Sequence, residues 1–270
     1  MKSLSEIRSI NYKHRKDENE EFFVNIDDWL KSPYSSLKAR YYIEVSSIIV
    51  YFLQSTKITP NQLSSLYAFL GLFSGFLIST NINSLIYSGL IIFFLKGVID
   101  WSDGLLARIT NKTSNIGHIV DTWGSHVGYF SLIFGLGMIA FNHELEAIYL
   151  IITVLIFLLS LLDFKLFSYH QLFYEILNNK LIVKKDNPNF LTEKEFKINF
   201  LKNCKIFLKY FLDDRARTLD LICLIAFLEI FYAKIIFTKI ILVLFLIKKL
   251  IVFIGNFLEI VILKKLKDKI

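Results

Sequence analysis

Three aspartates lie at the ends of two apolar segments that follow each other along the chain. Asp100 and Asp103 come directly after the apolar residues 85–99, and Asp121 comes shortly before the apolar residues 127–141. An ionised side chain costs about 3 kcal/mol or more inside lipid, so acidic residues at such positions point to function. We therefore take this cluster as the candidate site and the rest of the chain as its scaffold.

Helical spacing places the first two carboxylates on one face. Asp100 and Asp103 are three residues apart, a separation that brings side chains to the same side of a helix. Gly104 and Ala107 add little bulk to that face, and Arg108 lies one turn beyond Gly104. The face therefore has room for a bulky ligand.

The second half of the cluster forms a single stripe. Gly117, Asp121 and Ser125 recur at intervals of four residues, which places them on one side of the following helix. Gly124 and Gly128 are small enough to let a neighbouring backbone or a bulky ligand come close. The small residues thus leave room around Asp121.

The donor atoms of this cluster indicate a hard divalent cation. Asp100, Asp103 and Asp121 offer carboxylate oxygens, and no cysteine or paired histidine lies nearby in the sequence. Such a set favours Mg²⁺ or Mn²⁺ over Zn²⁺. Magnesium held by a few carboxylates usually shares its remaining positions with substrate phosphates. The sequence therefore predicts chemistry on a phosphate or diphosphate.

The same residues resemble the signature of the CDP-alcohol phosphotransferase (CDP-alcohol phosphatidyltransferase) family, D-x2-D-G-x2-A-R-x8-G-x3-D-x3-D. Seven of its eight positions match at the right spacing: Asp100, Asp103, Gly104, Ala107, Arg108, Gly117 and Asp121. The preceding Thr59, Pro60 and Asn61 are similar to the entry into the first membrane helix of that family. The resemblance extends over roughly residues 59–141.

The resemblance implies an enzyme that moves a phospho-alcohol or phosphatidyl group from a CDP-linked donor to an acceptor hydroxyl and releases CMP. It implies that the metal ligands are Asp100, Asp103 and Asp121. It implies that the nucleotide is bound by Asp100, Asp103, Gly104, Ala107, Arg108 and Gly117. The implied partners are CDP-diacylglycerol or another CDP-alcohol, a lipid or small polar alcohol acceptor, membrane lipids and a second copy of the chain.

The chain departs from the signature at the last aspartate, which is replaced by Ser125. In the family that carboxylate is the implied general base and helps to hold a second metal, and a serine hydroxyl does neither well. His126 is adjacent, but one residue along a helix turns a side chain by about 100°. We name Asp121, Ser125 and His126 as candidate catalytic residues.

Three interpretations of this departure remain open. Another group, such as His126 or a group on the acceptor, takes the proton. Alternatively, the acceptor is acidic enough to need no base. In the third, the protein binds the CDP donor and the metal without transfer.

Composition identifies the class of protein. Hydrophobic residues make up 54% of the chain and its mean hydropathy is +0.50, values typical of a polytopic membrane protein. Two cysteines are too few for a disulfide framework. The basic residues behind the net charge of +7 flank apolar segments, which suits anionic lipid headgroups rather than nucleic acid.

We predict an all-α integral membrane protein in three parts. Residues 1–28 form a polar, solvated arm, and residues 29–57 form an amphipathic helix in the membrane interface, with Tyr41, Ile48 and Phe52 on its apolar side. Residues 58–270 form the transmembrane domain, which includes a basic cytoplasmic loop near 164–217. Its six predicted spans are 63–80, 85–101, 116–141, 147–162, 219–237 and 240–263.

The distribution of lysine and arginine places the motif and both termini in the cytoplasm, with the plasma membrane of a prokaryote as the expected location. Arg215 and Arg217 precede the fifth span on the same side and are candidates to bind the acceptor. Asp220 and Glu229 lie inside that span, and we expect them to face the interior of the bundle.

Overall fold

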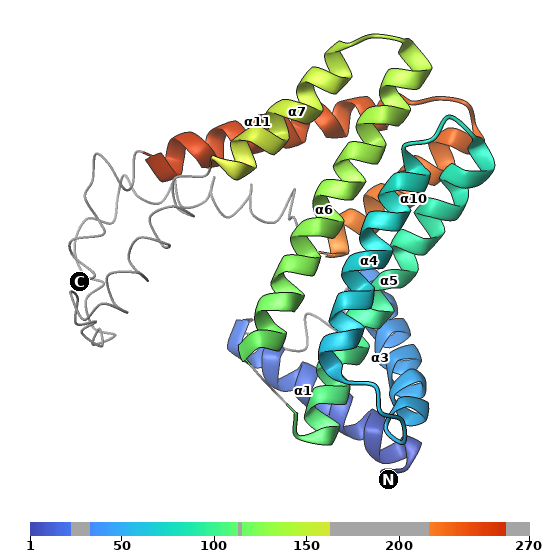
Figure 1. Cartoon of the computed structure of the whole chain (residues 1–270), viewed down its shortest axis with the longest axis vertical. Coiled ribbons are helices and arrows are strands. Elements are labelled where there is room, and N and C mark those ends of the chain that lie inside the picture. Colours follow the sequence, from blue (N-terminus) through green and yellow to red (C-terminus); the bar gives the residue numbers. More distant parts are fainter. Residues whose placement is uncertain (23–32, 113–114, 163–215, 258–270) are drawn as a thin grey trace. The chain divides into compact units, whose positions relative to one another are not determined.

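The computed structural model describes residues 1–22, 33–112, 115–162 and 216–257, and the regular elements in these ranges are α-helices (Figure 1). They are α1 (Leu4–Phe22), α3 (Pro33–Leu53), α4 (Pro60–Ile78), α5 (Asn83–Thr110), α6 (Asn115–Glu144), α7 (Ile148–Leu161), α10 (Ala216–Phe231) and α11 (Ile236–Phe257). The all-α class is therefore confirmed.

Four helices are long and apolar enough to cross a membrane: α4, α5, residues 119–144 of α6, and α11. The other two predicted spans are helical but shorter, because α7 has 14 residues and α10 has 16. A spanning helix usually needs about 20 residues. The described helices thus support an integral membrane protein, with four of the six predicted spans reaching full length.

The chain divides into two compact units at a boundary inside α6, Met1–Gly135 and Leu136–Ile270. In the first unit, α4 and α5 lie side by side, and α3 packs against α5 (Figure 1). In the second unit, α7 and α10 both pack against α11. The whole signature motif lies in the first unit.

The start of α4 is defined by its sequence. Thr59 caps the helix, its side chain accepting from the Gln62 N–H while the Gln62 side chain accepts from the Thr59 N–H, and Pro60 occupies the first turn. This reciprocal cap satisfies two backbone groups that a helix start leaves without partners. It therefore fixes the residue at which α4 begins, next to residues of the candidate site.

Glycines let α4 and α6 approach closely within the first unit. A Cβ atom on Gly71 would lie 3.1 Å from the Cα of Gly128. A Cβ on Gly75 would lie 2.7 Å from the carbonyl oxygen of Ser131. A Cβ on Gly75 would therefore require the backbone to shift, and one on Gly71 would require a smaller adjustment. The small residues therefore serve helix packing at this depth.

The amino-terminal residues differ from the expected solvated arm. Residues 4–22 form α1, which packs against α3. Ile7 is fully buried in a cluster with Val50, Leu105 and Leu106, and Asn11 is fully buried as well. The sequence did not predict this packing. The helix is polar, and it is held by a few apolar contacts and one polar network, all made to residues that are distant in sequence.

The interfacial segment is a helix, as predicted, and its two sides differ. Tyr42 and Ile43 are buried in the unit. Tyr41, Ile48 and Phe52, which the sequence assigned to the apolar side, are exposed. An exposed apolar side is what a helix in the membrane interface needs, and the interfacial placement itself stays a prediction.

Candidate active site

The motif lines a cavity of about 310 Å³ in the first unit. Its wall is formed by the end of α5, the starts of α4 and α6, the residues between α5 and α6, and α1. The lining residues are His14, Pro60, Asn61, Ser64, Asp103, Gly104, Ala107, Arg108, Lys112, Gly117 and Asp121. Six of the seven matched signature residues thus share one cavity, although the sequence separates them into two helices.

Asp103 is the best-defined acid of this wall. Its side chain is buried, with 6% of the residue exposed, and it accepts a hydrogen bond from the Ser64 hydroxyl of α4. Ser64 Oγ also lies 3.3 Å from the Pro60 carbonyl oxygen. The start of α4 therefore positions one carboxylate oxygen of Asp103, a role of Ser64 that no sequence pattern indicates.

Gly104 leaves open space beside Asp103. A Cβ atom on this glycine would meet only the Arg108 side chain within 4 Å, with Nη1 nearest at 3.4 Å. That is an ordinary contact with a flexible side chain, so helix packing does not require glycine here. The space over Gly104 belongs to the cavity, as expected for a position that accommodates a ligand.

Asp100 lies behind this wall. Its Oδ1 atom is buried and has no hydrogen-bond partner in the described part of the chain. Asp100 interacts electrostatically with Asp121, Asp103 and Lys96. Three acidic groups thus lie close enough to repel one another, an arrangement that is costly unless a cation reduces the repulsion.

Lys96 is a buried cation that the sequence reading missed. Only 5% of the residue is exposed, and its Nζ lies 4.1 Å from the ring centroid of Tyr67 and 4.4 Å from that of Phe93. A Cβ on Gly128 would come within 2.8 Å of this nitrogen, so glycine makes room for it. The available signal was a charged residue one helical turn before Asp100 in an apolar segment.

Ser125 and His126 lie outside the cavity lining. Both residues are exposed, and the Ser125 hydroxyl lies 3.4 Å from the Tyr67 hydroxyl. Their catalytic roles stay predictions. The structure instead brings His14 to the wall, and the sequence reading had placed that residue in the solvated arm.

The acceptor-binding candidates lie elsewhere in the chain. Arg215 is outside the described residues, and Arg217 lies in α10 with a side chain that is not described. Their role stays a prediction. Asp220 and Glu229 are 3% and 7% exposed, so the expected inward orientation of both acids is confirmed.

A larger cavity of about 390 Å³ lies in the second unit, lined by Ile225, Leu228, Glu229, Tyr232, Lys234, Ile236 and Phe237. Most of this wall is apolar, and both oxygens of Glu229 accept hydrogen bonds from α11. Size alone therefore does not identify the site, and the smaller cavity carries the reactive groups.

The acidic wall suits a divalent cation only in part. In the described ranges, no group of three or more His, Cys, Asp or Glu side chains could hold a metal ion by itself. Asp103 and Asp121 on the wall, with the buried Oδ1 of Asp100 behind them, still fit Mg²⁺ or Mn²⁺. These ions commonly complete their coordination with substrate phosphates and water.

Comparison with known proteins agrees with the motif. Residues 57–180 match the family model described as CDP-alcohol phosphatidyltransferase. A search of curated proteins finds no match to this chain. The matched segment contains α4, α5, α6, α7 and all seven signature residues that the sequence analysis identified. The resemblance seen in the motif is therefore confirmed over residues 57–180, which are similar to the CDP-alcohol phosphatidyltransferase family.

Proposed function

We propose that the protein transfers a phospho-alcohol or phosphatidyl group from a CDP-linked donor to an acceptor hydroxyl and releases CMP. The observation that carries this proposal is the cavity itself. Asp103, Asp121 and Arg108 share one wall with the open space over Gly104, inside the family segment. Such a transfer needs acids to hold a cation, a guanidinium to bind phosphate, and space for a nucleotide.

Each residue has a defined task in this proposal. Asp103 and Asp121, with Asp100 behind them, would hold Mg²⁺ or Mn²⁺, which neutralises the charge that develops on the departing CMP. Arg108 binds a phosphate oxygen of the donor, since a guanidinium matches phosphate geometry. Gly104, Ala107 and Gly117 leave space for the nucleotide. The acceptor oxygen then attacks the phosphorus that bears the alcohol, and the bond to CMP breaks.

The membrane setting follows from the same proposal. Exposed apolar residues on α4, such as Phe69, Leu72 and Phe76, suit contact with lipid. We place the site and both termini in the cytoplasm, in a prokaryotic plasma membrane, where cytosolic nucleotide reaches the cavity. The product would enter phospholipid or related lipid or glycan synthesis. We also propose a homodimer, on the family resemblance alone.

One observation favours a second function. Ser125 replaces the motif carboxylate and lies outside the cavity lining. A protein of this kind could bind the CDP donor and the cation without transfer. This alternative predicts Mg²⁺-dependent CDP binding with no turnover for any acceptor.

The deciding experiment is CMP release by detergent-purified protein with Mg²⁺ or Mn²⁺. A panel of CDP donors is offered with lipid extracts and small alcohols as acceptors. Release that disappears in Asp103→Asn supports the transferase. Donor binding without release supports the alternative, and activity that appears only in Ser125→Asp would identify a disabled site. No CDP binding at all would contradict both functions.

A further inference from the structure

The amino-terminal helix contributes a histidine to the cavity of the motif. His14 lines the wall together with Asp103, Arg108 and Asp121, although nearly ninety positions separate it from the motif in sequence. Its position on α1 is three residues after Asn11, which is fully buried. Side chains at this spacing point to the same side of a helix, so His14 continues the inward side of α1.

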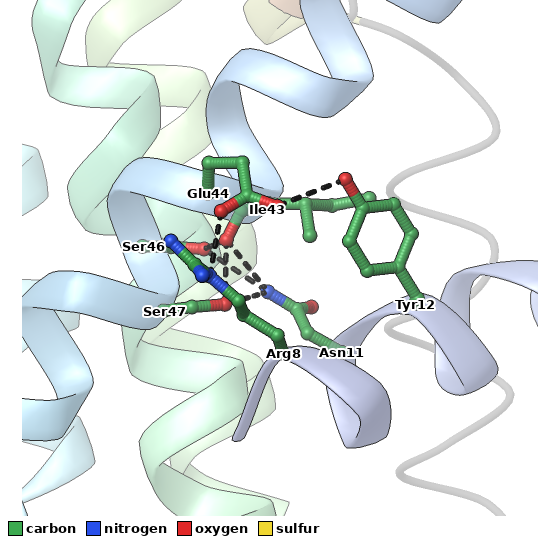
Figure 2. A network of polar contacts seen from close by, with 7 residues as sticks. All are labelled: Arg8, Asn11, Tyr12, Ile43, Glu44, Ser46 and Ser47. Carbon is green, nitrogen blue, oxygen red and sulfur yellow. Dashed lines mark hydrogen bonds and ion pairs between the residues drawn. The ribbon is translucent and has the colours of Figure 1, made fainter. Parts of the chain in front are cut away.

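The position of His14 is fixed by a hydrogen-bond network one turn earlier (Figure 2). The Asn11 amide nitrogen Nδ2 lies 3.3 Å from the Ile43 carbonyl oxygen, 3.1 Å from Ser46 Oγ and 3.3 Å from Ser47 Oγ. Both serine hydroxyls also donate to the Ile43 carbonyl oxygen. Because buried polar groups are costly without partners, the bonds to Asn11 Nδ2 favour the observed register of α1 on α3.

Two further contacts hold α1 at the edge of this network. The Arg8 guanidinium pairs with the Glu44 carboxylate at 2.7 Å, and the Tyr12 hydroxyl donates to the same carboxylate at 3.1 Å (Figure 2). Closer to the terminus, the Gln54 side chain bonds both backbone groups of Lys2, each at 2.9 Å. Contacts from Lys2, Arg8, Asn11 and Tyr12 thus tie the amino-terminal residues to α3 and to Gln54 just after it, and α1 brings His14 to the cavity.

The cavity needs a proton acceptor that the motif does not supply. Asp103 and Asp121 on the wall are assigned to the cation, and Arg108 and Lys112 are cations themselves. Ser125 and His126 do not line the cavity. Imidazole is the side chain that most often accepts a proton near neutral pH. Among the described lining residues, His14 is therefore the group suited to this task.

We infer that His14 is the general base of the transfer, an inference that rests on the proposed function. Its imidazole takes the proton of the acceptor hydroxyl as the acceptor oxygen forms a bond to phosphorus. The bond from that phosphorus to the CMP oxygen breaks, and the electron pair leaves with CMP. A residue of α1 thus replaces the carboxylate that the motif lacks at Ser125.

The first test compares two variants of this residue. His14→Gln keeps hydrogen-bonding capacity but cannot accept the proton, and it should lower kcat by about 100-fold or more with little change in the KM for the CDP donor. His14→Ala should show the same loss, and added imidazole should restore part of its rate. His143→Ala is the matched control and should keep full activity, because His143 is exposed and bonds only to Glu144 among the contacts described.

A chemical footprint tests the placement of His14 without turnover. Diethyl pyrocarbonate modifies accessible histidines, and mass spectrometry reads each site separately. CDP with Mg²⁺ should slow modification of His14 and leave His143 unchanged. This measurement uses the wild-type chain, so it decides the placement even where a variant fails to fold.

The outcomes separate the two levels of the proposal. Wild-type transfer together with an unchanged rate in His14→Gln would overturn the role of His14 and leave the transferase intact. CDP binding without protection of His14 would overturn it as well. If neither CDP binding nor CMP release is found, the transfer proposal fails and the role of His14 falls with it.

Discussion

Each unit has an acid with a buried carboxylate oxygen in an apolar helix, and the two acids have opposite surroundings. In the second unit, Glu229 accepts from the backbone N–H groups of Phe237 and Thr238, the latter at 2.8 Å, and from the Thr238 hydroxyl at 2.5 Å. In the first unit, Asp100 has a buried Oδ1 without a hydrogen-bond partner in the described part and lies near other carboxylates.

The difference shows what an acid inside a membrane helix means. Glu229 satisfies N–H groups at the start of α11, which have no partner within the helix, and its negative charge suits that end of the helix dipole. Its role is structural. Asp100 has no such backbone donors in the described part of the chain, and it faces the carboxylates of Asp103 and Asp121 as well as the cation Lys96. A position inside an apolar helix identifies both acids as candidates for a functional role. The hydrogen-bond partners of their oxygens distinguish the structural acid from the candidate site acid.

The largest expected effect is on catalysis and comes from Asp103→Asn. CMP release should fall by about 1000-fold or more, because the wall loses a charge that would help to hold the proposed cation. Thermal unfolding in detergent should occur at the same or a higher temperature, since one like-charge repulsion is removed. If Asp103→Asn lost as much stability as a Glu229 variant, the distinction between a site acid and a structural acid would be contradicted.

Glu229→Ala should lower the stability of the protein and leave ligand binding unchanged, the opposite of what we expect for Asp103→Asn. Two N–H groups and one hydroxyl lose their acceptor, which should lower the free energy of unfolding by about 3 kcal/mol. CDP affinity of the folded protein should stay at its wild-type value. Glu229→Gln retains one acceptor oxygen and should cost less. Denaturant unfolding and CDP titration measure the two quantities, and weakened CDP binding with unchanged stability would contradict the structural role.

Two glycines extend the comparison to small residues. Gly75→Ala should destabilise the protein by about 2 kcal/mol, because its Cβ would collide with the backbone of Ser131. Gly104→Ala meets only the Arg108 side chain, so stability should hold or rise slightly. The same change narrows the cavity and should weaken CDP binding. If the two substitutions changed stability equally, Gly75 could not be distinguished from Gly104 as the glycine required for helix packing.

The smallest predicted effect concerns the hydroxyl that orients Asp103. Ser64→Ala should weaken Mn²⁺ affinity in the presence of CDP by about 10-fold, since residues that orient a metal ligand usually matter at that level. Ser74→Ala is the matched control on α4, because its hydroxyl bonds the Gly71 carbonyl of its own helix. Mn²⁺ titration followed by electron paramagnetic resonance measures both. Equal affinities in the two variants would remove Ser64 from the site.

Sequence spacing predicted the acidic stripe and the all-α class because both depend on local periodicity. Asp103, Gly104 and Arg108 follow one another along a single helix, and such neighbours keep their relation in any fold. Ser64, Lys96 and His14 were missed because their roles arise from contacts between distant segments. A serine in a helix, a lysine in a span and a histidine in a polar arm each have an ordinary alternative that sequence alone does not remove.

The adjacent pair Ser125 and His126 shows a related limit. The spacing assigned both residues to the reactive end of α6, yet the wall of the cavity ends before them. Helical periodicity predicts the side of a helix on which a residue lies. How far along that side the ligand space extends depends on the neighbouring helices, here on Tyr67 of α4, whose hydroxyl meets Ser125.

The contacts that hold α4 to α6 differ in stiffness from those that hold α1. At Gly71 and Gly128 backbone meets backbone, so no long side chain can change rotamer when the helices are pushed together. By contrast, α1 is held in part by the Arg8–Glu44 pair, whose side chains are 42% and 38% exposed. We therefore expect a change in lateral pressure or bilayer thickness to displace α1 before it separates α4 from α6, so the rate of the proposed transfer should depend on the surrounding lipid.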